Sequence, residues 1–198
     1  MKIVVIKEIR EGEKRVALTP DGVKSLTKAG YECHIESGAG EGSFISDEQY
    51  RNAGAHISTS KDELLSGGDI LIKVNPPVAD EIAKMKEGSV LISFMYAFSN
   101  AELVQTLMKR KVSAFSMDAV PRTTKAQRMD ALSSQASLGG YKAVMMGANA
   151  LGKIFPLMMT AAGTITPSKV LIFGAGVAGL QALATAKRLG AVVEVTDI

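Results

Sequence analysis

The stretch KVLIFGAGVAGLQALATAKRLGAVVEVTDI, residues 169–198, decides the fold class of this chain. An apolar, β-branched run predicts a buried strand over residues 169–173, and a helical pattern follows it as far as Leu189. Gly190 is a helix stop signal, and a second strand is expected over residues 192–195. A strand, a helix and a strand in this order predict a βαβ unit with two parallel strands.

The turn between the first strand and the helix has the spacing G-x-G-x-x-G, which is typical of dinucleotide-binding folds. The first glycine permits a tight turn, the second lets a pyrophosphate approach the backbone, and the third lets the helix pack closely on the strand. The pyrophosphate would bind the positive end of the helix dipole. The acid about 20 residues further on would accept a hydrogen bond from an adenosine ribose and repel a 2′-phosphate. We therefore expect NAD(H) binding, in preference to NADP(H), at Gly174, Ala175, Gly176, Val177, Gly179 and Asp197. A glycine-rich turn that serves only packing is the alternative.

The composition is that of a globular α/β protein. The 198 residues are 46% hydrophobic, and 23 Lys and Arg against 20 Asp and Glu give a net charge of +3. The charges are interspersed, which argues against a nucleic-acid-binding arm, and no run of about 18 apolar residues predicts a membrane span. One cysteine and two histidines cannot complete a zinc site, and the single Cys33 indicates a reducing compartment. Since Met1 directly precedes the first expected strand, we expect no signal or transit peptide.

Strand and helix signals alternate over the first 120 residues. Thr19 before Pro20 predicts a helix start, and Ser60 with Glu63 predicts another with a capping box. Such alternation is typical of a parallel sheet covered by helices on both faces. The expected fold class is α/β, with two doubly wound, Rossmann-like parallel-sheet domains of which the second is truncated in this chain. Strands are expected at residues 2–7, 31–36, 69–74, 90–94 and 112–115, and one is expected to start at His56.

We expect an N-terminal α/β domain over residues 1–135 and the start of a nucleotide-binding domain over residues 169–198. Residues 136–168 between them are expected to form a connecting helix, to about residue 153, and a linker. Small residues in this helix predict close packing against another helix. Four methionines are expected to fill a core: Met145, Met146, Met158 and Met159.

The polar segment PRTTKAQRMDALSSQ, residues 121–135, is the candidate site from side-chain chemistry. Gln127, Asp130 and Ser133 recur every three residues, so they could face a planar polar group, such as a carboxamide, from one side of a turn or helix start. A helix cap is the alternative role for Asp130 and Ser133. His34 and His56 lie on expected strands and are interpreted as structural residues.

Four stretches resemble the alanine dehydrogenase/transhydrogenase family, and within it the NAD(H)-binding first domain (the N-terminal portion of the alpha subunit) of proton-translocating NAD(P) transhydrogenase. The similarity covers the whole chain, and AQRMDALSSQ is its most specific piece. The stretches are EIREGEKRVALTP (8–20), LIKVNPP (71–77), RTTKAQRMDALSSQASLGGYKAV (122–144) and MTAAGTITPSKVLIFGAGVAGLQALATAKRLGAVVEVTDI (159–198).

This resemblance implies a peripheral component that binds NAD(H) and passes hydride directly to NADP on a separate component, while a membrane component couples the transfer to proton translocation. It implies a homodimer, inactive alone, in the bacterial cytoplasm at the inner face of the plasma membrane and not inserted in it. It also implies that the dihydronicotinamide and its carboxamide are held by Arg122, Gln127, Asp130 and Ser133, with Tyr141 a weaker candidate. Because hydride moves between two cofactor rings, the protein would supply positioning.

Two other functions remain open. Alanine dehydrogenase shares the motif around Arg15 and a strand-end lysine like Lys73, but that family uses a histidine at the end of the fifth strand, where this chain has Tyr96. Oxidative deamination without that proton carrier would be difficult, so Arg15 and Lys73 are left outside the candidate site. The second alternative is a truncated, catalytically incompetent fragment that only folds, dimerises or binds partners, because the expected nucleotide-binding sheet lacks strands.

Overall fold

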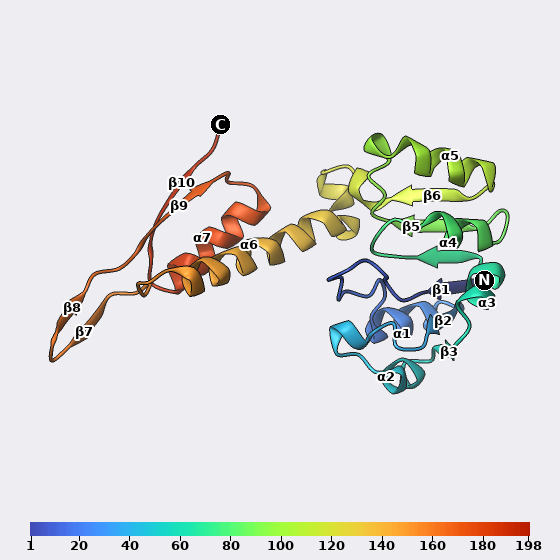
Figure 1. Cartoon of the computed structure of the whole chain (residues 1–198), viewed down its shortest axis with the longest axis horizontal. Coiled ribbons are helices and arrows are strands. Elements are labelled where there is room, and N and C mark those ends of the chain that lie inside the picture. Colours follow the sequence, from blue (N-terminus) through green and yellow to red (C-terminus); the bar gives the residue numbers. More distant parts are fainter. The chain divides into compact units, whose positions relative to one another are not determined.

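The chain forms two compact units, residues 1–120 and residues 121–198, in a computed structural model that describes residues 1–198 (Figure 1). The division precedes the polar segment 121–135, which the sequence analysis placed in the N-terminal domain. That segment leads directly into helix α6 (Ala131–Ala150), which packs against α7 (Val177–Arg188) of the second unit. The polar segment and α6 therefore belong to the same compact unit as the glycine motif.

The first unit contains a six-stranded parallel sheet with the order β3-β2-β1-β4-β5-β6. The strand order reverses between β1 and β4, which makes this point the switch point of a doubly wound sheet. The expected α/β class is confirmed. The strands are β1 (Lys2–Val5), β2 (Glu32–Glu36), β3 (His56–Ser58), β4 (Ile70–Ile72), β5 (Val90–Ser93) and β6 (Ser113–Ser116).

Helices cover both faces of this sheet because alternate strand residues point to opposite sides. Val5 and Cys33 pack in a core with side chains of α1 and α2, while Val4 and Leu91 pack in another with side chains of α3, α4 and α5. The helices are α1 (Pro20–Lys28), α2 (Asp47–Asn52), α3 (Lys61–Gly67), α4 (Ala79–Lys84) and α5 (Ala101–Lys109), with 3-10 turns at Glu41–Ser43, Ala97–Ser99 and Met117–Ala119.

The predicted helix starts are present, with one correction. Thr19 is the N-cap of α1, and its hydroxyl accepts a hydrogen bond from the Gly22 N–H at 3.3 Å. Ser60 caps α3 by accepting from the Glu63 N–H at 3.3 Å, but the predicted capping box is wrong. The Ser60 N–H donates to the Ser58 hydroxyl at 3.1 Å, so this neighbour takes the bond that the Glu63 side chain was expected to make.

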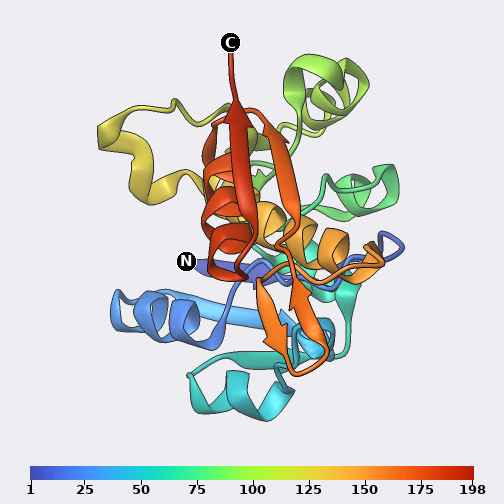
Figure 2. The ribbon, with the colours of Figure 1, turned by 90° about the vertical axis from the view of Figure 1, so that its left-hand side faces the viewer.

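The second unit contains the predicted βαβ arrangement. β9 (Lys169–Phe173) and β10 (Val192–Thr196) are parallel and in register, and α7 connects them. Figure 2 shows the two strands side by side with α7 on one face. A core of Val144, Phe155, Ala186 and Ala191 lies between the helices and strands. The opposite face of the pair is open: Leu171 is 56% exposed, so β9 is not the fully buried strand that its sequence predicted.

Residues 136–168 differ from the expected connector in two ways. The helix was expected to begin near residue 136, but it begins at Ala131, because Asp130 is its N-cap. The expected linker contains an antiparallel hairpin formed by β7 (Met158–Thr160) and β8 (Gly163–Ile165). The prediction that the four methionines fill a core is wrong, since they lie on surfaces that no other element of the unit covers; Met145, Met146, Met158 and Met159 are all exposed.

The packing of α6 on α7 depends on one glycine. A Cβ atom at Gly140 would overlap the backbone carbonyl of Ala178, whereas a Cβ atom at Gly139 would meet nothing within 4 Å. We expect Gly140→Ala to lower the free energy of unfolding of this unit by roughly 1–3 kcal/mol, as overpacking does. The matched control Gly139→Ala should raise it, by up to about 1 kcal/mol, because alanine favours helix. Urea denaturation followed by circular dichroism measures both; equal effects would contradict this account of the packing.

Candidate nucleotide-binding site

The glycine turn between β9 and α7 has the geometry that its motif predicts. Gly174 has φ +99°, a conformation that favours glycine. Gly176 is the N-cap of α7, and the space where its Cβ would lie is open. A Cβ atom at Gly179 would overlap the carbonyl oxygen of Gly174, so this position brings the helix against the turn. The backbone at the start of α7 is thus exposed to an approaching group.

Asp197 lies beside this turn. Its carboxylate accepts hydrogen bonds from the Ala175 N–H at 2.5 Å and from the Ile198 N–H at 2.8 Å. These bonds, the one from Ala175 above all, lower the pKa of Asp197 below its usual value. The acid at the end of β10 is therefore ionised at neutral pH and joined to the turn that carries the motif.

A pocket of about 300 Å³ joins the turn to the polar segment. Two of the candidate residues from that segment, Arg122 and Ser133, line it, and Gly174, Gly176 and Gly179 line it from the turn. Its remaining wall is Leu132, Ala136, Phe173, Val177 and Ala178. A cation, a hydroxyl and a helix N-terminus around one cavity are groups that bind a phosphorylated ligand with a polar end group.

Asp130 acts on this pocket through Ser133. As the N-cap of α6, its carboxylate accepts from the Ser133 N–H at 2.9 Å and from the Ser133 hydroxyl at 2.6 Å. The hydrogen bond from the Ser133 hydroxyl is the main cause that lowers the pKa of Asp130. Since the hydroxyl proton is directed to Asp130, the Ser133 oxygen keeps its lone pairs for a donor in the pocket. The helix-cap alternative for Asp130 is thus present, and it fixes the orientation of Ser133.

The two remaining candidates do not line the pocket. Gln127 lies on an exposed 3-10 helix (Thr124–Met129), and its carbonyl accepts from the Asp130 N–H at 3.3 Å. Tyr141 lies on α6 and is 49% exposed. The expectation that Gln127 contacts a nicotinamide therefore stays a prediction.

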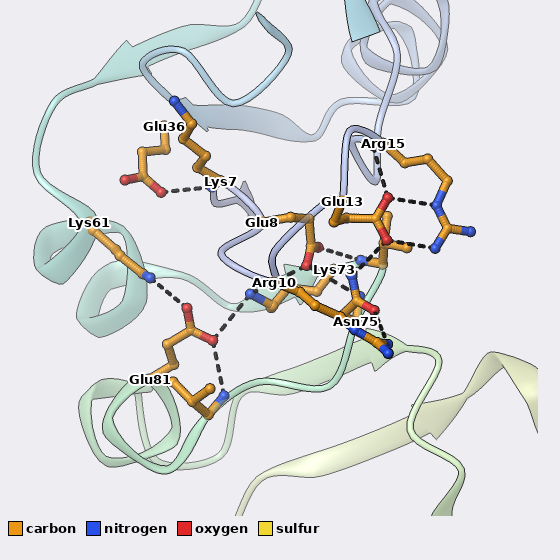
Figure 3. A network of polar contacts seen from close by, with 12 residues as sticks. Lys7, Glu8, Arg10, Glu13, Arg15, Glu36, Lys61, Lys73, Asn75 and Glu81 are labelled. Carbon is orange, nitrogen blue, oxygen red and sulfur yellow. Dashed lines mark hydrogen bonds and ion pairs between the residues drawn. The ribbon is translucent and has the colours of Figure 1, made fainter. Parts of the chain in front are cut away.

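The switch point of the first unit contains a buried charge network that the sequence analysis did not identify (Figure 3). The side chain of Lys73, 1% exposed, follows β4, and its ammonium nitrogen lies 3.1 Å from Glu81 and 3.8 Å from Glu8. Lys61, at the first position of α3, bonds the other oxygen of Glu81. Glu8 also accepts from the backbone N–H groups of Val74 and Asn75. Each buried charge is thus paired, as burial requires.

Arg15 is engaged at the rim of the same network. Its guanidinium donates two hydrogen bonds to Glu13, at 2.8 and 2.6 Å, and Asn75 donates a third to this carboxylate at 2.9 Å. The Arg15 hydrogen bond is the main cause that lowers the pKa of Glu13 to about 2. The sequence signal for this network was the cluster of acidic and basic residues just after the first strand. Their partners are distant in the sequence, so the pairing could not be predicted from it.

No histidine lies at the end of β5. Tyr96 follows this strand with φ +50°, and the Asp118 carboxylate accepts from the N–H groups of Met95 and Tyr96 at 2.9 and 3.0 Å. The two histidines of the chain, His34 and His56, stack on one another across β2 and β3 with ring centroids 4.8 Å apart. Their position in the sheet agrees with the structural role expected for them.

Two family models together match nearly the whole chain. Residues 4–139 match the N-terminal domain of alanine dehydrogenase/PNT, and residues 143–198 match its C-terminal domain. The chain belongs to the alanine dehydrogenase/PNT family. Membership agrees with the resemblance drawn from the four sequence stretches.

Curated relatives and solved structures are similar to this chain over nearly its whole length. The chain is 50% identical to the first portion of the NAD(P) transhydrogenase subunit alpha of Rhodospirillum rubrum, over 100% of this chain and 53% of that protein. A crystal structure of transhydrogenase from Sinorhizobium meliloti matches with a TM-score of 0.96 and 43% identity, over 100% of this chain and 59% of that one. An L-alanine dehydrogenase structure matches with a TM-score of 0.87 and 31% identity, over 98% of this chain and 54% of that one.

This member of the family therefore spans about half the length of the Rhodospirillum rubrum protein. Among its helices, none combines the length and the apolar character that crossing a bilayer requires.

Proposed function

We propose that this chain is the NAD(H)-binding portion of a proton-translocating NAD(P) transhydrogenase, in which hydride passes directly between NAD(H) and NADP(H). The observation that carries the proposal is the pocket in which Arg122 and Ser133 meet the glycine turn. The 50% identity to a transhydrogenase alpha subunit and the structural match to a transhydrogenase support the same assignment.

The residues around the pocket fit a dinucleotide. The open space at Gly176 leaves room for a pyrophosphate on the N–H groups at the start of α7. Asp197, held beside the turn by Ala175, is ionised and would receive an adenosine ribose while disfavouring a 2′-phosphate. Arg122 brings a positive charge to the same cavity. NAD(H), when bound, supplies the hydride that is transferred.

The side chains of this chain would bind and orient the nucleotide. Ser133, whose hydroxyl proton is directed to Asp130, would accept a hydrogen bond from the carboxamide of the nicotinamide. Asp130 is a positioning residue, because it fixes the Ser133 hydroxyl and the first turn of α6. Gln127 would reach the nicotinamide from the neighbouring 3-10 helix. Neither a histidine nor a free carboxylic acid is needed, since hydride transfer between two rings requires alignment more than proton transfer.

The remaining components follow from the same assignment. We propose an NADP(H)-binding component as hydride acceptor or donor, a membrane component that couples transfer to proton movement, and a homodimer of this chain. A chain that binds only one of the two nucleotides would be inactive alone, and its place would be the cytoplasmic side of the plasma membrane, without insertion. None of these partners requires nucleic acid or a metal.

Alanine dehydrogenase is the second candidate, because its structures are similar to this chain. Two observations favour transhydrogenase. Tyr96 follows β5, where alanine dehydrogenase would use a proton-carrying histidine, and Arg15 and Lys73 are each paired with carboxylates of the chain itself. The third candidate is a chain that folds and binds partners without taking part in hydride transfer.

The assay that separates these candidates uses the chain with and without an NADP-binding component of a transhydrogenase. We expect reduction of NADP⁺ by NADH only in the mixture, and no formation of NADH from NAD⁺ and alanine. Oxidation of alanine would favour the second candidate. Binding of NADH without transfer in the mixture would favour the third, and absence of NADH binding would reject the proposal.

The preference for NAD(H) can be tested at Asp197. Asparagine there keeps an oxygen for the Ala175 N–H but removes the charge, so Asp197→Asn should lower the ratio of the NADPH and NADH dissociation constants at least about tenfold. Fluorescence titration with each nucleotide measures this ratio. Glu194→Gln removes an exposed charge from the same strand and should leave it unchanged. A ratio that stays the same in Asp197→Asn would remove Asp197 from the ribose site.

A further inference from the structure

The two histidines of the chain form a stacked pair at one edge of the sheet in the first unit. His34 on β2 and His56 on β3 lie opposite one another in the parallel register, with ring centroids 4.8 Å apart and 28° between the ring planes. β3 is an edge strand of three residues, and β2 is its neighbour in the sheet (Figure 1). The pair therefore lies across the ladder that attaches β3 to the sheet.

The surroundings of His34 favour its neutral form. Its side chain is 20% exposed, and its Nε2 atom is buried without a hydrogen bond. The carboxylate of Glu32 lies 3.7 Å from this nitrogen, which is too far for a hydrogen bond, and Glu32 is itself exposed to water. Burial is the main cause that lowers the pKa of His34. The charges of Lys2 and His56 lower it further, and Glu32 opposes them.

The helix that packs on this face of the sheet adds no further charge to the pair. His34 is in register with Val4, which packs in a core with side chains of α3. The three charged side chains of α3 are bonded to other groups or exposed; they are Lys61, bonded to Glu81, Asp62, paired with Lys84 at 3.0 Å, and the exposed Glu63. The groups that act on the His34 imidazole are thus Lys2 on β1, Glu32 on β2 and His56 on β3.

We propose that the histidine pair is a pH-sensitive contact, whose protonation in mildly acidic solution loosens β3 from β2. A first proton leaves one neutral ring for the charged ring to stack on. A second proton places like charges directly opposite one another on neighbouring strands, which is destabilising.

The direction of the pH dependence follows from the lowered pKa of His34. The folded edge binds fewer protons than the loosened edge, so the attachment of β3 becomes weaker as the pH falls. The stabilisation is present in full above the ordinary histidine pKa of 6.5, and it is lost as the pH falls from there through the lowered pKa of the folded state.

Loosening of β3 would reach the buried charge network at the switch point. Ser58, the last residue of β3, accepts a hydrogen bond from the Ser60 N–H at 3.1 Å, and Ser60 is the N-cap of α3. Lys61, at the first position of this helix, bonds Glu81 within the network. The histidine pair is therefore joined to the network through consecutive positions of the chain. This inference goes beyond the proposed function and does not depend on nucleotide binding.

The first test measures hydrogen exchange of the full chain by mass spectrometry at about pH 7.5 and about pH 5.5, with rates corrected for their intrinsic pH dependence. Protection of β3, residues 56–58, should fall at least about tenfold relative to β5, residues 90–93, as the uptake of one proton allows. His34→Gln removes the titrating ring and should abolish this relative loss. A native β3 that keeps its protection, or a loss that persists in His34→Gln, would overturn the proposal.

A matched pair of exposed carboxylates sharpens this test. Glu32→Gln removes the group that opposes the lowered pKa of His34, so the relative loss at about pH 5.5 should be larger than in the native chain. Glu48→Gln removes an exposed carboxylate from α2 and should leave the loss as it is in the native chain. Equal losses in the two variants would contradict the electrostatic origin of the effect.

The second test observes the imidazoles directly in the native chain and does not require His34→Gln to fold. Because the chain contains two histidines, an NMR titration shows two imidazole signals, which the exposed position of His56 allows His56→Gln to assign. The His34 signal should titrate below 6.5, and the Ser60 amide should shift over the same pH range. Titration of His34 at or above 6.5 would overturn the proposal, and a Ser60 amide that does not respond would overturn the link to the charge network.

Discussion

The candidate site depends on the close approach of two helices, which a glycine makes possible. Gly140 places the backbone of α6 against the carbonyl of Ala178 in the first turns of α7. As a result the start of α6, with Ser133, lies beside the start of α7 and the glycine turn before it. Gly179 makes a second close approach, to Gly174, and holds α7 on that turn. Glycines that appear to serve only packing therefore bring the binding groups together.

The polar groups of this unit are arranged to orient a ligand. The Asp130 carboxylate accepts two hydrogen bonds from Ser133, and the Asp197 carboxylate accepts two from backbone N–H groups, so both acids are held in their charged forms. Hydrogen bonds to the charged form are the cause of their lowered pKa values. A site of this kind offers fixed acceptors and donors rather than a group ready to exchange a proton. That agrees with a function in which the transferred hydride belongs to the nucleotide.

Local sequence signals predicted the parts of the fold that short-range physics controls. The βαβ arrangement, the N-cap at Thr19 and the alternation of strands and helices all follow from propensities and capping within a few residues. The incorrect predictions have two causes: a neighbouring group competes for a hydrogen bond, or burial depends on elements that are distant in the sequence. Ser58 takes the hydrogen bond that the capping box at Ser60 required. The methionines of α6 and the hairpin are exposed, although they were expected to fill a core. Apolar character alone does not show which face of an element another element covers.

The site was only partly predictable for the same reason. Sequence spacing identified the polar segment and the glycine motif separately, and the resemblance to a family linked them to one nucleotide. The sequence offered a helix cap as one role for Asp130, but it could not show that this cap would also direct the Ser133 hydroxyl, nor that Gln127 would lie outside the pocket. The buried network around Lys73 needed the folded sheet, since Glu8 lies in the loop after β1 and Glu81 lies in α4.

The most direct test of the account compares the binding of NADH and of ADP-ribose, which lacks the nicotinamide, by the native chain and two variants. Gly176→Val fills the open space at the turn and should weaken both ligands at least about tenfold. Ser133→Ala removes one hydrogen bond from the carboxamide end, so it should weaken NADH by about threefold to tenfold and leave ADP-ribose unchanged. Equal loss of both ligands in Ser133→Ala, or no loss in Gly176→Val, would contradict the claim that this pocket joins the two ends of one dinucleotide.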